Sequence, residues 1–573
     1  MEFAHYKCFI MTLFLAVVVC KVVIVSRLHG SDFPSCGKGN NLKTACRTIA
    51  FATTQAQWND TIRIDGTDTS RDPYPCSSMV SNQSGIFVNK SLSFKKFGNA
   101  EVFLNCSAKR IMFDGRNASG TVSIQFMGLT LINSRIVVQE CSLFVESCVF
   151  RDAISFPNAT AVINFQSSEA EFILAIKNSF FKNNRFPCVR VAGNRPKVEV
   201  DDTAFFNNTA TWASLAGAPV AVFIVLLSAK QTTLSSFSSV NLTNTLFVGN
   251  VSPEGSLLIK TSSASFANRK SRGIYKTNKN TENATASPMI YCSTKHRSRH
   301  ESRARVSVEI GGGTFSHNVG RAISASRISV VNMSITSSVF RNNSSPYAGG
   351  ALVFEDNQEF SLQIVDSKFI GNSAKHGGSA LYAFGVSATL SILLRNVSFV
   401  KNVVREPDFA TDFSYGGALT LDHMKYWTRG YYMKVLLEKV SFLLNKAAMG
   451  ASTLQIGGYI LNIIIKDCNF LWNLHDERFS HNWKIAVIVA YRLNFTMIRT
   501  AVSGNYARPR ADNTTLAGQP IHFLVLGLYT AHLNICNLQY RNNKGGGIFI
   551  QLGMSEHNEN STLLMQDSHF ENN

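Results

Sequence analysis

Two adjacent carboxylates, Asp201 and Asp202, end a segment of alternating apolar residues that is typical of a β-strand. Paired carboxylates in such a place are the groups that acid–base cleavage of a glycan requires, and with further oxygen ligands they bind calcium. The chain holds only 37 Asp and Glu residues in 573, so clusters of carboxylates are not expected. We therefore predict no enzymatic activity, no catalytic residues, no cofactor and no metal ion.

A second set of residues resembles a fragment of a zinc site. His296 and His300 lie four residues apart, close to Cys292. The surrounding segment lacks a helical pattern, and its many cationic neighbours disfavour a bound metal cation. We expect these side chains to be exposed to solvent.

A basic segment accounts for much of the net charge of +19. Residues 261 to 305 interrupt the repeat described below, and we expect an inserted, poorly ordered surface loop. The loop is either simply solvated or binds anions such as sulfated or sialylated glycans. Because the charge is local, we do not expect nucleic acid as a partner. The candidate anion-binding residues are Arg269, Lys270, Arg272, Lys295, Arg297, Arg299, Arg303 and Arg305.

A repeat must position all of these residues. It consists of three apolar residues at alternating positions, a Phe five residues further on, and an Asn three after that, as in Phe360, Leu362, Ile364, Phe369 and Asn372. Alternation indicates a strand with one buried face, and recurrence every 24 to 32 residues for most copies indicates a solenoid. The anchors are Leu131, Phe150, Phe181, Phe205, Phe247, Phe315, Phe340, Phe369, Phe399, Phe442, Phe470, Val502, Tyr540 and Phe570.

Stacking of successive coils about 4.8 Å apart explains the residue types of the repeat. We expect Phe369 to lie between Phe340 and Phe399 in one buried stack. The Asn that follows twelve of the fourteen anchors is predicted to mark a corner. There it either adopts a left-handed backbone and binds the turn amides, or pairs with the Asn of the next coil in a ladder.

Glycine pairs followed by a short apolar strand come after several corners and allow a bend with close backbone approach. Together with Phe-x-x-Asn, they resemble the repeats of the chlamydial polymorphic outer membrane proteins and of extracellular β-helix proteins of animals, to which the N-terminus is more similar. The resemblance covers about residues 120 to 573 and implies a fold rather than a function. The copies are Gly349-Gly350-Ala351-Leu352, Gly377-Gly378-Ser379-Ala380-Leu381, Gly416-Gly417-Ala418-Leu419 and Gly545-Gly546-Gly547-Ile548.

The N-terminus is predicted to direct export. Residues 1 to 30 contain a lysine followed by an apolar run and are expected to be a signal peptide, cleaved between Ser26 and Gly30. The alternative is a signal anchor that tethers the chain to a membrane through residues 8 to 25. Residues 31 to 60 are expected to form a cap with a short amphipathic helix that covers the open end of the first coil.

The cysteines are concentrated in the N-terminal third of the chain, as expected for disulfides in an exported protein. Pairs Cys36–Cys46 and Cys76–Cys106 are our interpretation, although spacing does not fix connectivity. Cys141 and Cys148 are further candidates, whereas Cys468 is expected to be a small core residue.

Sequons for N-glycosylation are frequent and predict a heavily glycosylated ectodomain if the source is eukaryotic. They begin at Asn59, Asn82, Asn89, Asn105, Asn117, Asn158, Asn207, Asn241, Asn250, Asn283, Asn332, Asn342, Asn343, Asn396, Asn494, Asn513 and Asn560.

The sequence thus predicts an all-β, right-handed parallel β-helix over residues 61 to 573 with a short N-terminal helical cap. The expected function is that of a secreted or cell-surface structural or adhesive rod whose partners are extracellular glycans or cell-surface proteins. One alternative is a pectin-lyase-like enzyme, although Asp201-Asp202 lacks the Asn-Thr-Asp, Gly-His-Gly and Arg-Ile-Lys elements of polygalacturonases. The other is a bacterial autotransporter adhesin passenger. A membrane tether after Asn573 is a further expectation, because the last repeat ends at a corner.

Overall fold

The structure is a computed structural model of the 573-residue chain. It describes residues 21–573 except 38, 40, 77–84, 108, 119, 155–159, 169–171, 211–220, 229–236, 253–254, 263–303, 387, 406–415, 423–430, 448–450, 476–483, 508–520, 545–546 and 553–560.

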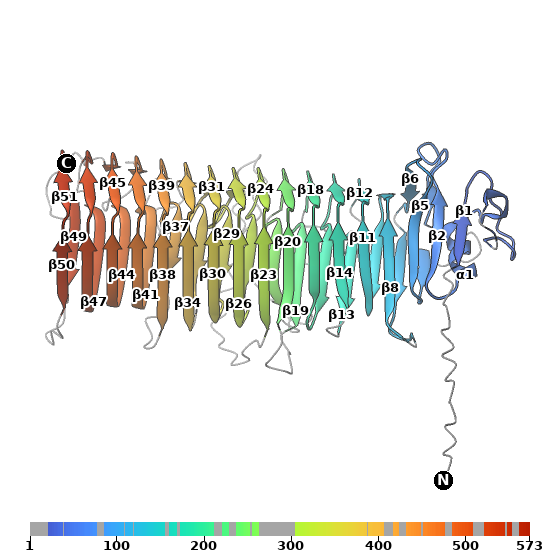
Figure 1. The fold of residues 1–573 in the computed structure, drawn as a ribbon, viewed down its shortest axis with the longest axis horizontal. Coiled ribbons are helices and arrows are strands. Elements are labelled where there is room, and N and C mark those ends of the chain that lie inside the picture. Colours follow the sequence, from blue (N-terminus) through green and yellow to red (C-terminus); the bar gives the residue numbers. More distant parts are fainter. Residues whose placement is uncertain are drawn as a thin grey trace, which may run out of the picture.

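The described chain winds into a parallel β-helix, with the cap helix α1 at one end of the rod and β51 at the other (Figure 1). The fold class expected from the sequence is confirmed. In each coil the chain passes along a first, a second and a third face, and in several coils along a short fourth sheet. Each described strand pairs in parallel with a counterpart in a neighbouring coil, so the three main faces have their open strand edges towards the two ends of the rod.

The first and second faces join into one sheet because three C-terminal strands run across both of them: β41 (Ala451–Lys466), β44 (Lys484–Ile498) and β47 (Ile521–Cys536). The first face otherwise contains β4 (Gly85–Val88), β7 (Arg110–Asp114), β10 (Arg135–Gln139), β13 (Ile163–Ser167), β16 (Val189–Gly193), β19 (Phe223–Ser228), β22 (Leu257–Ser262), β25 (Ile323–Ser326), β29 (Leu352–Glu355), β33 (Leu381–Phe384), β37 (Leu419–Asp422) and β49 (Gly547–Leu552). The second contains β1 (Val22–Val25), β2 (Asp60–Asp65), β5 (Leu92–Phe97), β8 (Val122–Met127), β11 (Cys141–Glu146), β14 (Ile173–Lys177), β17 (Lys197–Asp201), β20 (Ser238–Thr243), β23 (Arg305–Gly311), β26 (Val330–Thr336), β30 (Glu359–Val365), β34 (Thr389–Arg395), β38 (Tyr432–Glu438) and β50 (Thr562–Gln566).

The third face consists of 16 short strands that carry the anchors. They are β3 (Tyr74–Pro75), β6 (Val102–Asn105), β9 (Leu129–Ile132), β12 (Val149–Arg151), β15 (Phe180–Lys182), β18 (Ala204–Phe206), β21 (Leu246–Val248), β24 (Thr314–Ser316), β27 (Val339–Arg341), β31 (Lys368–Ile370), β35 (Ser398–Val400), β39 (Ser441–Leu443), β42 (Asn469–Leu471), β45 (Ala501–Ser503), β48 (Gln539–Arg541) and β51 (His569–Glu571). The fourth sheet contains β28 (Ser344–Ser345), β32 (Ser373–Ala374), β36 (Val403–Val404), β40 (Lys446–Ala447), β43 (Leu474–His475) and β46 (Tyr506–Ala507).

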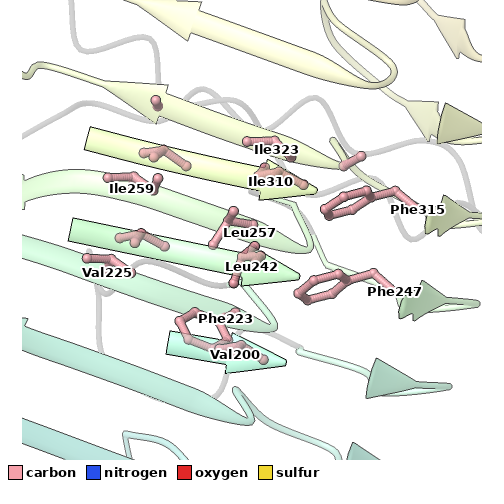
Figure 2. Packing of buried hydrophobic residues seen from close by; sticks show 14 of the residues in the cluster. Val200, Phe223, Val225, Leu242, Phe247, Leu257, Ile259, Ile310, Phe315 and Ile323 are labelled. Carbon is pink, nitrogen blue, oxygen red and sulfur yellow. The ribbon is translucent and has the colours of Figure 1, made fainter. Parts of the chain in front are cut away.

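The anchor side chains form the predicted buried stack. Phe369 lies between Phe340 and Phe399, with ring centroids 4.7 and 5.0 Å apart and interplanar angles of 3° and 16°. In Figure 2, Phe247 and Phe315 lie above one another beside the aliphatic side chains of the other two faces. The fourteen anchors expected from the sequence are too few, because Tyr74 and Leu104 occupy the anchor position in two coils that precede Leu131. Neither residue carries the Phe-x-x-Asn signal.

The regular spacing of the asparagines places their side chains in a buried, hydrogen-bonded ladder. Asn372 is typical: its side-chain Nδ2 donates to the Oδ1 of Asn402 at 3.0 Å and to the carbonyl oxygen of Phe340 at 2.9 Å. Of the two alternatives expected from the sequence, pairing with the Asn of the next coil is confirmed. The left-handed backbone is wrong for these asparagines, because the positive φ belongs to the preceding residue, for example 63° at Gly371. The ladder runs through Asn184, Asn208, Asn250, Asn318, Asn343, Asn372, Asn402, Asn445, Asn473, Asn505, Asn543 and Asn573.

The glycine pairs at residues 349–350, 377–378 and 416–417 lie where the chain enters the first face, whereas Gly545 and Gly546 lie outside the described residues. Gly349 has φ of 66°, and a Cβ atom on Gly350 would lie 2.5 Å from the carbonyl oxygens of both Ser373 and Ser379. The backbones of neighbouring coils therefore approach too closely for any other residue at Gly350.

The N-terminal end differs from the expected division of the chain. Strand β1 (Val22–Val25) pairs in parallel with β2, and Val23, Ile24 and Val25 are almost fully buried. Cleavage between Ser26 and Gly30 would remove this strand from the first coil, and the leader boundary at residue 30 stays a prediction. A run of β-branched residues suits both a leader and a buried strand. Only its pairing distinguishes the two.

The cap contains the 3₁₀ helix η1 (Leu42–Thr44) and the helix α1 (Ile49–Gln55). Thr48 caps α1 by accepting a hydrogen bond from the backbone N–H of Phe51. Ile49, Ala52 and Thr53 are buried against the first coils, as the sequence predicts for the helix face. Within the described residues, no helix combines the length and hydropathy needed to cross a membrane.

Two disulfides fasten this end of the rod: Cys36–Cys46 and Cys76–Cys106. They are the two pairs inferred from the sequence. Cys141 and Cys148 are not disulfide-bonded, contrary to expectation: both are buried in the core, Cys141 at the start of β11 and Cys148 just beyond its other end. Desolvation by burial raises the pKa of the Cys148 thiol to about 11, so it is unreactive at neutral pH. Cys468 is a buried core residue, as expected.

Candidate functional site

An exposed apolar patch lies on the third face, outside the anchor stack. Side chains on either side of each anchor point outward, and here three of them are large and apolar: Phe180, Phe206 and Leu246 are 54, 41 and 40% exposed. They occupy three consecutive coils, in which Phe180 and Leu246 flank Ala204 in one column and Phe206 lies beside that column. We call these three residues the third-face patch. Contiguous exposed apolar side chains of this kind mark interaction surfaces.

The predicted glycosylation sites differ in their exposure to solvent. Asn250 and Asn343 are buried members of the asparagine ladder, and each Nδ2 donates two hydrogen bonds. A glycan on either nitrogen would break the ladder, so these two predictions are wrong. Asn105 is half-buried. Nine sites are exposed, namely Asn59, Asn89, Asn117, Asn207, Asn241, Asn332, Asn342, Asn396 and Asn494, whereas Asn82, Asn158, Asn283, Asn513 and Asn560 lie outside the described residues.

Most of the predicted anion-binding residues cannot be placed. Arg269, Lys270, Arg272, Lys295, Arg297, Arg299 and Arg303 lie outside the described residues, as do His296 and His300. The expected bounds of the insertion are too wide, because Thr261 and Ser262 end strand β22 and Arg305 begins β23. The Arg305 guanidinium lies over the ring of Phe237, 5.7 Å from its centroid, so this residue belongs to the second face rather than to a loop.

The adjacent carboxylates lie at the edge of the second face. Asp201 is the last residue of β17, aligned with Lys177 and Thr243 of the neighbouring coils, and Asp202 occupies the exposed left-handed corner that follows, with φ of 44°. Across the described residues, no group of three or more His, Cys, Asp or Glu side chains is arranged to hold a metal ion.

Other carboxylates of the second face form ion pairs between coils. Glu438 accepts hydrogen bonds from Arg395 at 2.8 Å and Lys466 at 3.2 Å, and Arg499 binds Asp467 through two nitrogens. The hydrogen bonds from Arg395 and Lys466 lower the pKa of Glu438, and that from Arg499 lowers the pKa of Asp467. These pairs link adjacent coils at exposed positions.

A row of tyrosines on the outside of the C-terminal coils was missed from the sequence. Tyr459, Tyr491 and Tyr529 are half-buried at the point where β41, β44 and β47 pass from the first to the second face. The signal was present, because Tyr431, Tyr459, Tyr491 and Tyr529 each precede an anchor by 11 residues. We call these four residues the tyrosine row. The alternation of buried and outward-facing residues is interrupted at the bend, so a search of the sequence for a two-residue period does not detect these tyrosines.

No protein-family model and no curated protein matches the chain. Among solved structures, the chain is similar to that of PfbA, a surface adhesin of Streptococcus pneumoniae, with 10% identity over 94% of each chain and a TM-score of 0.24. Likeness at this level carries no argument about function. The fold assignment rests on the strand pairing described above.

Proposed function

We propose that the protein is a non-enzymatic structural or adhesive ectodomain, a rigid rod that binds a cell-surface protein through the third-face patch. The 16 third-face strands at about 4.8 Å give a rod on the order of 70 Å long. A rod of this kind holds separate contact surfaces at fixed spacing, which favours multivalent attachment.

The observation that carries this proposal is the exposure of Phe180, Phe206 and Leu246 on a flat, regular sheet. Side chains of this size cost free energy when hydrated, at about 25 cal/mol per Å² of apolar area. Burial against a partner recovers that free energy. From β9 to β51, no sequon begins within a third-face strand, but the exposed sequon at Asn207 directly follows Phe206. Contact through the third-face patch therefore requires Asn207 without a glycan.

Two features support an extracellular location. Disulfides such as Cys36–Cys46 and Cys76–Cys106 form and persist in oxidising compartments. Nine sequons stand at exposed positions where a glycan has room. Secretion by a leader that ends before Val22 fits both features and keeps strand β1 in the mature chain.

Adhesion of protein-coated beads to a panel of cell types tests the proposal. The double variant F180S/F206S is expected to lose most of the adhesion with an unchanged melting temperature, because both positions are on the surface. Trp472→Ser is the matched control: it removes an aromatic side chain that is 58% exposed in a distant coil and should leave adhesion intact. Equal adhesion of the double variant and the unaltered protein would reject the third-face patch as the contact.

A further inference from the structure

The tyrosine row is an ordered aromatic surface. The rings of Tyr459 and Tyr491 are 4.7 Å apart, those of Tyr491 and Tyr529 are 5.1 Å apart, and both pairs are parallel to within 7°. Tyr431 extends the row by one coil, since its carbonyl oxygen accepts a hydrogen bond from the backbone N–H of Ile460. In such a stack the neighbours cover the ring faces. Each half-buried tyrosine therefore exposes the edge of its ring and its hydroxyl group to solvent.

Cationic and amide side chains of the second face border the row. Arg492 is exposed, and its guanidinium lies 5.7 Å from the centroid of the Tyr529 ring. The next outward column contains exposed Lys434 and, in register with it, Asn462, Asn494 and His532. On the second-face side, the two columns beside the tyrosines contain no carboxylate in these four coils; they consist of Tyr432, Ile460, Arg492 and Thr530, followed by Lys434, Asn462, Asn494 and His532.

We propose that the tyrosine row, together with Arg492 and Lys434, binds an acidic polysaccharide that lies along the axis of the solenoid. Guanidinium and ammonium groups bind carboxylate or sulfate oxygens, while phenol hydroxyls and Asn amides bind sugar hydroxyl groups. Because each coil repeats these groups at about 4.8 Å, a polymer contacts them several times along its length. The chemistry requires both anionic and hydroxyl groups in the ligand, which distinguishes an acidic glycan from a neutral one.

Asn494 gives this site a point of control, because it begins an exposed sequon within the bordering column. A glycan on Asn494 would stand beside Tyr491 and Arg492 and occupy the space of the ligand. The site therefore requires Asn494 without a glycan. Asn494→Gln keeps the amide and removes the attachment point.

Binding of size-defined heparin and hyaluronan oligosaccharides to immobilised N494Q protein, with dextran as the neutral probe, tests the assignment. The acidic oligosaccharides should bind and dextran should not. Arg492→Gln is expected to weaken binding by about tenfold, the effect of one lost charged hydrogen bond. Tyr491→Phe keeps the stack, removes one hydroxyl group and should weaken binding by a few fold. Both variants should retain the melting temperature of the parent.

Two controls separate this site from the other surfaces. Arg341→Gln neutralises an exposed arginine of the third face, and R297Q/R299Q/R303Q removes charge from the basic segment; neither should change the affinity more than twofold. Loss of binding only in the basic-segment variant, or unchanged binding in R492Q, would overturn the assignment. So would a preference for anionic lipid vesicles over both acidic glycans. Adhesion through the third-face patch is measured with F180S/F206S, so either proposal can fail without the other.

Discussion

The anchor stack and the tyrosine row have the same geometry in different surroundings. Phe442 and Phe470 lie 4.9 Å apart and are fully buried, whereas Tyr459 and Tyr491 lie 4.7 Å apart on the outside of the coils that carry Phe470 and Val502. In both places the coil spacing stacks identical side chains, because the register between coils is fixed along the whole strand. The difference shows that stacking follows from the repeat, whereas burial depends on which side of the sheet carries the ring.

Removal of an anchor ring should have the largest effect. Phe399→Ala opens a cavity between Phe369 and Phe442 that the regular coils cannot close. We expect a loss of about 3 to 5 kcal/mol in the free energy of unfolding, measured by chemical denaturation. A loss below about 1 kcal/mol would mean that the anchor stack is no more important to stability than a surface row.

Removal of a ladder asparagine should cost slightly less. Asn402→Ala leaves the carbonyl oxygen of Phe369 and the backbone N–H of Asn372 buried without their hydrogen-bond partner. We expect about 2 to 3 kcal/mol of destabilisation. Asn332→Ala, at an exposed position of β26 with an ordinary strand backbone, is the control and should change stability by less than about 0.5 kcal/mol. Equal effects of the two variants would contradict the role assigned to burial.

Removal of an exposed ring should have a smaller effect still. Tyr491→Ala deletes two stacking contacts, with Tyr459 and with Tyr529, without opening a cavity in the core. A loss of about 1 kcal/mol is expected in the same unfolding assay. A loss as large as that of Phe399→Ala would mean that the tyrosine row mainly stabilises the fold, and it would count against the row as a binding surface.

The ion pairs between coils should contribute a small, pH-dependent part of the stability. The pKa of Glu438 is lowered in the folded state by Arg395 and Lys466, so its contribution is present above the ordinary value of 4.5 and is lost as the pH falls through the lowered pKa. Glu438→Gln should therefore flatten the acid limb of a plot of melting temperature against pH. No change in that limb would show that the pair is screened by solvent.

The smallest expected effect concerns glycan cleavage, which we expect to be absent. Asp201 and Asp202 lie at a strand end and an exposed corner, and we predict no turnover of pectin, hyaluronan or chondroitin by the purified protein. Turnover that Asp201→Ala or Asp202→Ala abolishes would favour the carbohydrate-active enzyme over the adhesive rod.

From about residue 120 onward, the sequence by itself determined the strands of the repeat, their buried sides and the register between coils. Alternation is a local property of a strand, and anchors such as Phe369 and Phe399 recur often enough to align the coils without any other information. The glycine pairs and the cap helix were also predictable, because close approach and amphipathic periodicity restrict the residue types at each position.

Only the tertiary structure decided which residues are buried or exposed at the corners of the coils, and which residues form strands at the ends of the rod. In these places the same local sequence pattern is compatible with different structures. Asn342 and Asn343 are neighbours with identical side chains, yet one is exposed with φ of 51° and the other is buried in the ladder. Val22–Val25 reads equally well as leader or strand until β2 pairs with it. The physical reason is that these positions are fixed by contacts with the next coil, which lies roughly 24 or more residues away along the chain.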